Sequence, residues 1–244
     1  MGGLIQGYLL AAVVAGANVL GGLMVTSTRV RGSKAAMNLL VAFGAGFMLA
    51  VAMLEMLPHS LEVEHGLLAV LLGYLAVHLT QHTLTPHFHF GEETHSDAMV
   101  GPGIGLWALI GLLPHSFFDG VAIMGGYLVS PEAGFLVFLA VLLHKVPTGV
   151  SLGSIMIASG NSTARALSAV GIVGVATVLG AVVTPVLPLL AEYGLALAAG
   201  VTIYVAASNL IPESQKMEGW FVPAGVFLGV LAFALIRLLM PGAH

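Results

Sequence analysis

The sequence consists largely of apolar segments that are each long enough to cross a membrane as an α-helix. A helix needs roughly 18 to 20 apolar residues to span the hydrocarbon core of a bilayer. Of the 244 residues, 58% are hydrophobic and only 7% are charged, which excludes a soluble globular domain. We predict an all-α membrane protein in which a single transmembrane domain covers residues 1–244. Its eight helices are expected at residues 4–26, 36–58, 66–84, 102–128, 134–158, 166–190, 194–213 and 219–240.

The positions of the basic residues predict how the helices are oriented. Cytoplasmic loops of membrane proteins are enriched in Lys and Arg. Five of the seven basic residues fall in the loops that follow the first, fifth and seventh predicted helices, all on one side of the membrane. Arg237 lies near the end of the last helix, and Lys145 lies inside a span. We therefore expect both termini outside the cytoplasm, in a prokaryotic plasma membrane. The five loop residues are Arg29, Arg31, Lys34, Arg165 and Lys216.

The connection after the third predicted helix is rich in histidine. His87, His89 and His95 lie in it together with Glu92 and Glu93. Imidazole and carboxylate groups suit borderline divalent ions. We interpret residues 86–99 as a cytoplasmic His-rich loop with weak metal affinity, and an ordinary solvated polar loop is the alternative.

Two helix endings share one pattern. Glu55-Met-Leu-Pro-His-Ser60 ends the second predicted helix, and Asn209-Leu-Ile-Pro-Glu-Ser214 ends the seventh. These helices would run in opposite directions across the membrane, as in transporters built from inverted repeats. We interpret helices 1–3 and 6–8 as inverted repeats around helices 4 and 5. The alternative is that a Leu-Pro step merely ends each helix.

Helices 4 and 5 place metal-ligating residue types inside the membrane. They contain His115-Ser-Phe-Phe-Asp119-Gly and His144-Lys-Val-Pro-Thr148-Gly. Residues four apart share a helix face, so His115 lies over Asp119 and His144 over Thr148. The chain has no cysteine, so a metal would be held by imidazole, carboxylate or hydroxyl groups. If the two faces oppose each other, they form a divalent-cation site.

The cost of burying charge separates this interpretation from ordinary buried histidines. An isolated intramembrane His could be a hydrogen-bonded core residue. Asp119 and Lys145, however, each cost roughly 2.5 to 3.5 kcal/mol on insertion scales, and such residues are usually functional. Four ionisable groups at one depth therefore favour a site over packing.

These segments resemble the ZIP (Zrt-, Irt-like protein) family of divalent-metal transporters. The family pattern is close to His-Asn-x-Pro-Glu-Gly followed by His-Glu-x-Pro-x-Glu. The resemblance implies passage of zinc or a related ion toward the cytoplasm through a midplane site between helices 4 and 5. It carries over His115, Asp119 and His144 as ligands of one ion. Ser116 and Thr148, which depart from the family pattern, are weaker candidates.

Further residues receive expected roles along this path. Lys145 stands where the family has a helix 5 Glu, and its ammonium could reach Asp119 and supply charge in place of a second ion. The alternative for Lys145 is that its side chain only packs against a neighbouring helix. Glu55 and His59 near the outer end and Glu213 near the inner end are expected as transient metal ligands. For Glu55 and Glu213, a solvated helix end is the alternative.

Two other classes of function are considered. An intramembrane zinc hydrolase would use His and Asp ligands, but it needs a general base and the sequence has no HExxH arrangement. A proton-coupled carrier of an organic solute could use Asp119 and Lys145 as a relay, but it leaves the paired histidines unexplained. We expect a transporter that catalyses no reaction, holds no cofactor, and has divalent ions and the bilayer as partners, with no nucleic acid. Small-residue seams would equally serve a homodimer.

Overall fold

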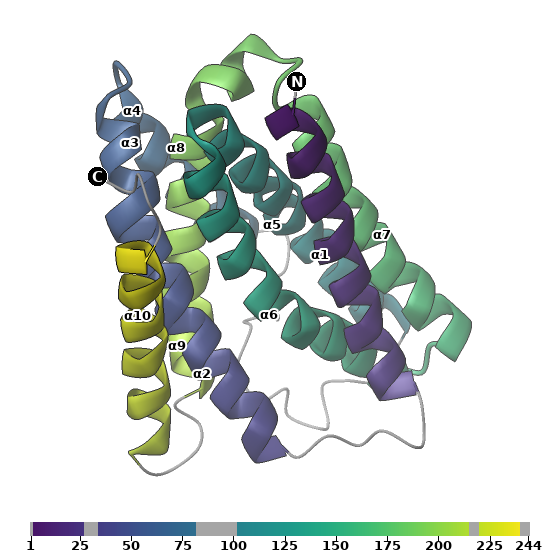
Figure 1. Ribbon diagram of the computed structural model, residues 1–244. Coiled ribbons are helices and arrows are strands. Elements are labelled where there is room, and N and C mark those ends of the chain that lie inside the picture. Colours follow the sequence, from purple (N-terminus) through teal and green to yellow (C-terminus); the bar gives the residue numbers. More distant parts are fainter. Residues whose placement is uncertain (1, 27–33, 82–101, 215–219, 240–244) are drawn as a thin grey trace.

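The computed structural model describes residues 2–26, 34–81, 102–214 and 220–239, and every regular element in these ranges is a helix. The expected all-α membrane fold is confirmed (Figure 1). The elements are α1 (Gly2–Thr26), α2 (Lys34–Val51), η1 (Ala52–Met56), α3 (Leu57–Leu61), α4 (Gly66–Leu79), α5 (Pro102–Val129), α6 (Pro131–Ala158), α7 (Thr163–Val183), α8 (Pro188–Tyr204), η3 (Val205–Leu210), α9 (Ile211–Ser214) and α10 (Phe221–Leu239).

Seven helical segments in the described ranges are long and apolar enough to cross a membrane. The exception is α4, which has 14 residues and is about 21 Å long at 1.5 Å per residue. Thr80 and Gln81 extend it by a π-helical turn, so its described part is shorter than the predicted helix at 66–84. The His-rich loop at 86–99 lies outside the described residues.

Local sequence signals explain some of the helix boundaries. The Ser130 side chain accepts a hydrogen bond from the Ala133 amide at 3.0 Å and caps α6. Pro188 occupies the first turn of α8 after an extended Leu187. The prediction placed this start at residue 194 and was therefore late. The preceding helix ends at Val183, before Pro185, whereas the prediction carried it to residue 190.

Two π-helical segments precede the prolines of the matched helix endings. The Leu57 amide donates to the Ala52 carbonyl and the Ile211 amide donates to the Ala206 carbonyl, each five residues back. Each π-segment, η1 and η3, is followed by a short helix with proline in its first turns. The two endings therefore share local backbone structure as well as sequence, although the inverted repeat itself stays a prediction.

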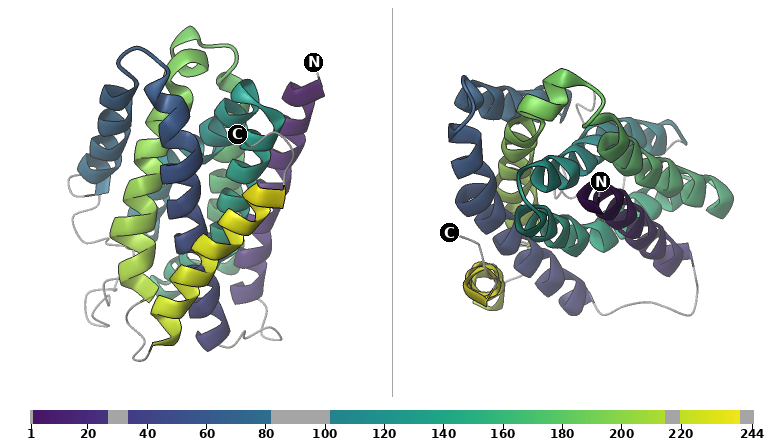
Figure 2. Two further views of the ribbon diagram at one scale, coloured as in Figure 1. Left: turned by 60° about the vertical axis from the view of Figure 1, so that its left-hand side comes forward. Right: turned by 45° about the horizontal axis from the view of Figure 1, so that its top comes forward.

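The helices pack in pairs that match the proposed repeat. Figures 1 and 2 show α5 and α6 side by side at the centre, with α1 and α7 on one side and α2 and α8 on the other. Exchanging the two halves of the chain converts the α1–α6 contact into α7–α5, and the α2–α10 contact into α8–α4. Both α1 and α10 have their terminal ends toward the same end of the bundle (Figure 1).

Glycines set the close approach of the helices that flank the centre. A Cβ atom on Gly21 of α1 would overlap the Val146 carbonyl of α6, and one on Gly149 would overlap the Asn18 carbonyl of α1. The α5–α7 crossing has the same arrangement. Small residues let helix backbones approach closely in lipid, where apolar side chains gain little by avoiding the solvent. These crossings hold α5 and α6 in position from both sides.

The distribution of side chains is that of an integral membrane protein. Large apolar side chains such as Leu67, Val186 and Leu238 are exposed on the outside of the bundle. Charged groups such as Asp119 and Lys145 are buried inside it. This arrangement suits a protein surrounded by lipid, because lipid tails contact the apolar outer face while polar groups lie buried in the interior of the bundle.

Candidate metal site

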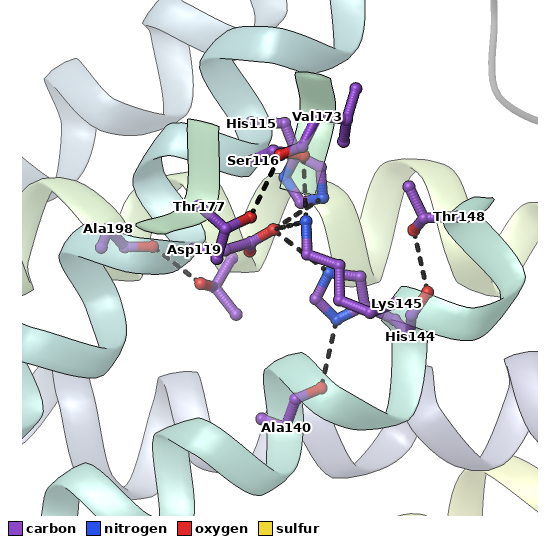
Figure 3. Close-up of polar contacts among 11 residues, drawn as sticks. His115, Ser116, Asp119, Ala140, His144, Lys145, Thr148, Val173, Thr177 and Ala198 are labelled. Carbon is purple, nitrogen blue, oxygen red and sulfur yellow. Dashed lines mark hydrogen bonds and ion pairs between the residues drawn. The ribbon is translucent and has the colours of Figure 1, made fainter. Parts of the chain in front are cut away.

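The most densely polar part of the interior is centred on the carboxylate of Asp119 (Figure 3). Its Oδ2 atom lies 3.5 Å from Nε2 of His115, 3.5 Å from Nε2 of His144 and 2.7 Å from Nζ of Lys145. All four side chains are at least 94% buried. Two imidazoles, one carboxylate and one ammonium thus share a single enclosed region.

The central helices place these groups at one depth. α5 and α6 each have 28 residues, and His115 and His144 lie at their respective centres. Pro114 and Pro147 lie beside the histidines, yet both helices continue through them. A proline cannot donate an intrahelical hydrogen bond, which is tolerated in membrane helices where neighbours compensate. The expected convergence of the two faces is what the structure contains.

The hydrogen bonding of His144 leaves one ring nitrogen available. Its Nδ1 lies 3.1 Å from the Ala140 carbonyl, and because a carbonyl only accepts, Nδ1 carries the proton in this bond. Nε2 has no hydrogen-bond partner among the described residues and faces Asp119. Metal-ligating histidines commonly donate their other N–H to a carbonyl, which orients the ring. His144 is therefore arranged as a metal ligand would be.

The spacing of the three candidate ligands suits a small divalent ion. Their ligand atoms all lie within 4.8 Å of one another. In a tetrahedral zinc site with bonds of about 2.0 to 2.2 Å, ligand atoms are roughly 3.3 to 3.6 Å apart. The two distances of 3.5 Å from Asp119 to the imidazole nitrogens fall in this range. Only modest adjustment would be needed to enclose an ion.

Lys145 is held tightly beside the three ligands. Its ammonium donates a 2.9 Å hydrogen bond to Ser116 Oγ in addition to its 2.7 Å contact with Asp119 (Figure 3). The side chain is fully buried, so its charge has no route to solvent in this conformation. A buried carboxylate needs such compensation, because an unpaired charge in the interior is strongly unfavourable.

A small cavity adjoins the histidines. With about 10 Å³, it has room for roughly one water molecule. Thr148 lines it, and the Thr148 hydroxyl donates to the His144 carbonyl at 2.8 Å, which leaves its oxygen lone pairs free to accept. Gln81 and Asn209 also line this cavity, and the sequence reasoning did not assign them to the site. The place of Asn209 at the start of the repeated ending was the signal that could have indicated it.

Glu55 and His59 come together elsewhere, at the junction of η1 and α3. His59 Nε2 lies 3.6 Å from Glu55 Oε1, and Arg237 from α10 lies 3.5 Å from Glu55 Oε2. These residues do not line the cavity beside the central histidines. Glu213 belongs to α9, but its side chain lies outside the part of the structure that is described.

The fold and this cluster define an integral membrane protein with metal-ligating side chains at the centre of its helix bundle. A family model described as ZIP Zinc transporter matches residues 92–237 of the sequence. The chain therefore belongs to the ZIP family, and it is a transporter of divalent metal ions and not an enzyme. The match covers α5 and α6, which carry the whole central cluster.

Curated relatives agree with the family assignment. The chain is 26% identical over 219 residues to proteins named zinc transporter ZupT from Salmonella newport (strain SL254) and Salmonella agona (strain SL483). Each alignment covers 82% of this chain and 84% of the relative. The relatives therefore match the bundle over most of its length, including part of the chain before the ZIP model begins.

Proposed function

We propose that the protein carries zinc, or a closely related divalent ion, toward the cytoplasm through one central site formed by His115, Asp119 and His144. The observation that carries this proposal is the convergence of three buried ligand atoms within 4.8 Å at the centres of α5 and α6. The names of the bacterial relatives support zinc as the cargo. Two imidazoles and one carboxylate are a ligand set that zinc accepts readily.

Lys145 makes the proposed site a single-ion site. The ammonium occupies the space between Asp119 and Ser116, so it supplies positive charge where a second ion would need ligands (Figure 3). It also weakens the hold of Asp119 on an arriving ion, since carboxylate charge is already compensated. Moderate affinity suits a transporter, because an ion that binds too tightly is released slowly. Ser116 and Thr148 would serve as auxiliary oxygen ligands.

The proposed direction rests on the distribution of basic residues. The positive-inside rule places the loops that contain Arg29, Arg165 and Lys216 in the cytoplasm and both termini outside, in a prokaryotic plasma membrane. In that orientation, Glu55 and His59 lie toward the outer end and Glu213 toward the inner end. The ion would pass between these residues as the central site opens alternately to each side, the general mechanism of transporters with paired repeats.

Zinc uptake by purified protein in liposomes tests the proposal. Separate His115→Ala, Asp119→Ala and His144→Ala variants should lose saturable uptake while remaining inserted and folded, since loss of one ligand to a three-ligand site reduces affinity severely. His65→Ala is the matched control, because His65 has 72% of its side chain exposed and lies away from the cluster. Undiminished uptake by both His115→Ala and Asp119→Ala would refute the site.

The same liposomes distinguish the cargo. Cobalt, manganese, iron and cadmium compete for similar ligands, so uptake of each should be measured against zinc at equal concentration. Metal-independent movement of organic solutes would instead support the relay of Asp119 and Lys145. We expect zinc uptake to be the fastest, with no solute flux in the absence of metal.

A further inference from the structure

A second charged cluster joins the last helix to the π-segment of the second membrane span. Arg237, in the last turn of α10, donates a 2.6 Å hydrogen bond from Nη1 to the Leu54 carbonyl. Its Nε lies 3.5 Å from Oε2 of Glu55, the next residue along. One guanidinium therefore contacts two consecutive residues of η1, which are 182 or more positions away in sequence.

The backbone of η1 explains why a carbonyl is available to Arg237. Pro58 lies four residues after Leu54 and has no N–H to donate to it. A carbonyl that lacks its helical partner in the membrane must be satisfied by another donor. Arg237 supplies that donor and so fastens α10 to the π-segment.

The carboxylate beside this carbonyl has the surroundings of a metal ligand. Glu55 is only 6% exposed, and its Oε2 atom has no hydrogen-bond partner among the described residues. His59 lies one turn later with Nε2 3.6 Å from Glu55 Oε1, and its buried Nδ1 also lacks a hydrogen bond there. Glu62 approaches the other side of the same ring, with Oε2 3.8 Å from Nδ1. Carboxylate and imidazole groups one turn apart suit a divalent ion.

Arg237 is more exposed to solvent than Lys145, the cation of the central site. Lys145 is fully buried and held by two partners, whereas 35% of the Arg237 side chain is exposed. A partly exposed guanidinium can regain water when it leaves, and an arriving divalent ion would supply the positive charge that the buried Glu55 carboxylate still needs. Arg237 can therefore leave Glu55, while Lys145 cannot leave Asp119 without moving buried groups.

We propose that Arg237 is an exchangeable counter-ion of a metal-capture site formed by Glu55 and His59. It neutralises Glu55 in the conformation described, and a divalent ion that binds Glu55 and His59 displaces it, which unfastens α10 from η1. The inference rests on the proposed function for the identity of the ion, but metal binding at this site does not require that transport occurs. Arg237 acts through Glu55 and is a positioning residue.

Cobalt titration in detergent tests the competition, since the absorption of bound Co²⁺ reports its ligands. The background is the full chain with His115→Ala and His144→Ala, which removes the central site and separates this test from the proposed function. Adding Arg237→Gln should tighten Co²⁺ binding about threefold to tenfold, because Gln can still donate to Leu54 but carries no competing charge. Arg237→Lys, which retains the charge, should bind within about twofold of the background. Adding Glu55→Gln should abolish the signal.

A distance measurement tests the release of α10 with Arg237 intact. Because the chain has no cysteine of its own, spin labels would attach only at the introduced residues of a Leu61→Cys/Leu238→Cys double variant. Leu61 and Leu238 are both exposed. In the same background, saturating Zn²⁺ should change the distance distribution between α3 and α10, and Glu55→Gln should remove this change. Unchanged Co²⁺ affinity in Arg237→Gln, or an unchanged distance distribution with bound Zn²⁺, would overturn the proposal.

Discussion

Replacing Lys145 with Met should destabilise the protein strongly, because it removes the cation that compensates Asp119. The carboxylate is 3% exposed, and the ammonium 2.7 Å away is fully buried. Breaking a buried ion pair by removal of one partner costs about 3 to 5 kcal/mol. For a protein of this length, each kcal/mol lowers the melting temperature by about 2 to 4 °C, so we expect a decrease of roughly 6 to 20 °C.

The double variant Lys145→Met/Asp119→Asn is the matched control. It removes both charges and leaves the packing volume nearly unchanged, so most of the lost stability should return. Zinc provides an independent readout. In Lys145→Met, the uncompensated Asp119 becomes a stronger ligand, and zinc at about 100 times its dissociation constant would restore roughly 2.7 kcal/mol. The double variant should gain little from zinc because it lacks the carboxylate.

Thermal unfolding in detergent, with and without zinc, measures all of these quantities. Recovery of the folded protein after heating can be followed by size-exclusion chromatography for the parent and each variant. If Lys145→Met melts at the temperature of the parent, the ammonium does not compensate Asp119. If zinc stabilises Lys145→Met no more than it stabilises the parent, the ammonium and the ion do not compete for the same carboxylate.

Three further predictions concern ion number, helix packing and the loop. Lys145→Glu should restore the ligand type of the family and raise the metal bound per purified chain from one toward two; unchanged metal content and uptake would contradict the counter-ion role. Gly21→Ala should cost about 1 to 3 kcal/mol and reduce uptake, because the new methyl group overlaps the Val146 carbonyl beside the central site. Gly16→Ala on the same helix is its control, since a Cβ there meets no described atom within 4 Å, and equal stability of the two variants would refute the packing argument. Shortening the His-rich tract at 87–95 should reduce liposome uptake only modestly, and complete loss in a folded deletion would place the bottleneck in the loop.

The sequence predicted the helical bundle well because lipid imposes simple rules on composition and length. Apolar runs identified the spans, but the starts marked by Ser130 and Pro188 were placed too late, at residues 134 and 194. The π-segments were not predicted, because the prolines that follow η1 and η3 were interpreted only as helix ends and the apolar periodicity does not reveal a wider hydrogen-bond register. The early end of α7 at Val183 was missed because the prediction followed hydrophobicity through the turn and did not use Pro185 and Pro188, which mark it.

The central cluster was also accessible from the sequence, because residues four apart on α5 and α6 must share a face. What the sequence could not supply was contact between distant segments. In the sequence, Arg237 stood out only as a basic residue near the end of the last helix, and nothing local indicates that it reaches Leu54 and Glu55. Asn209 and Gln81 reach the cavity through the packing of η3 and the end of α4, which depends on tertiary structure.

The contrast between continuous and interrupted helices bears on how the site could open to each side. The cluster lies on α5 and α6, which run without a break for 28 residues each and are fixed by glycine crossings to α7 and α1. The helices that carry the proposed end ligands are interrupted: η1 contains Glu55 and separates α2 from His59, and η3 separates α8 from Glu213. A π-segment has weaker, shifted hydrogen bonds and is a common location of functional bending. Access would therefore change most cheaply by movement of α3 and α9 about η1 and η3, while α5 and α6 keep the ligand distances nearly constant.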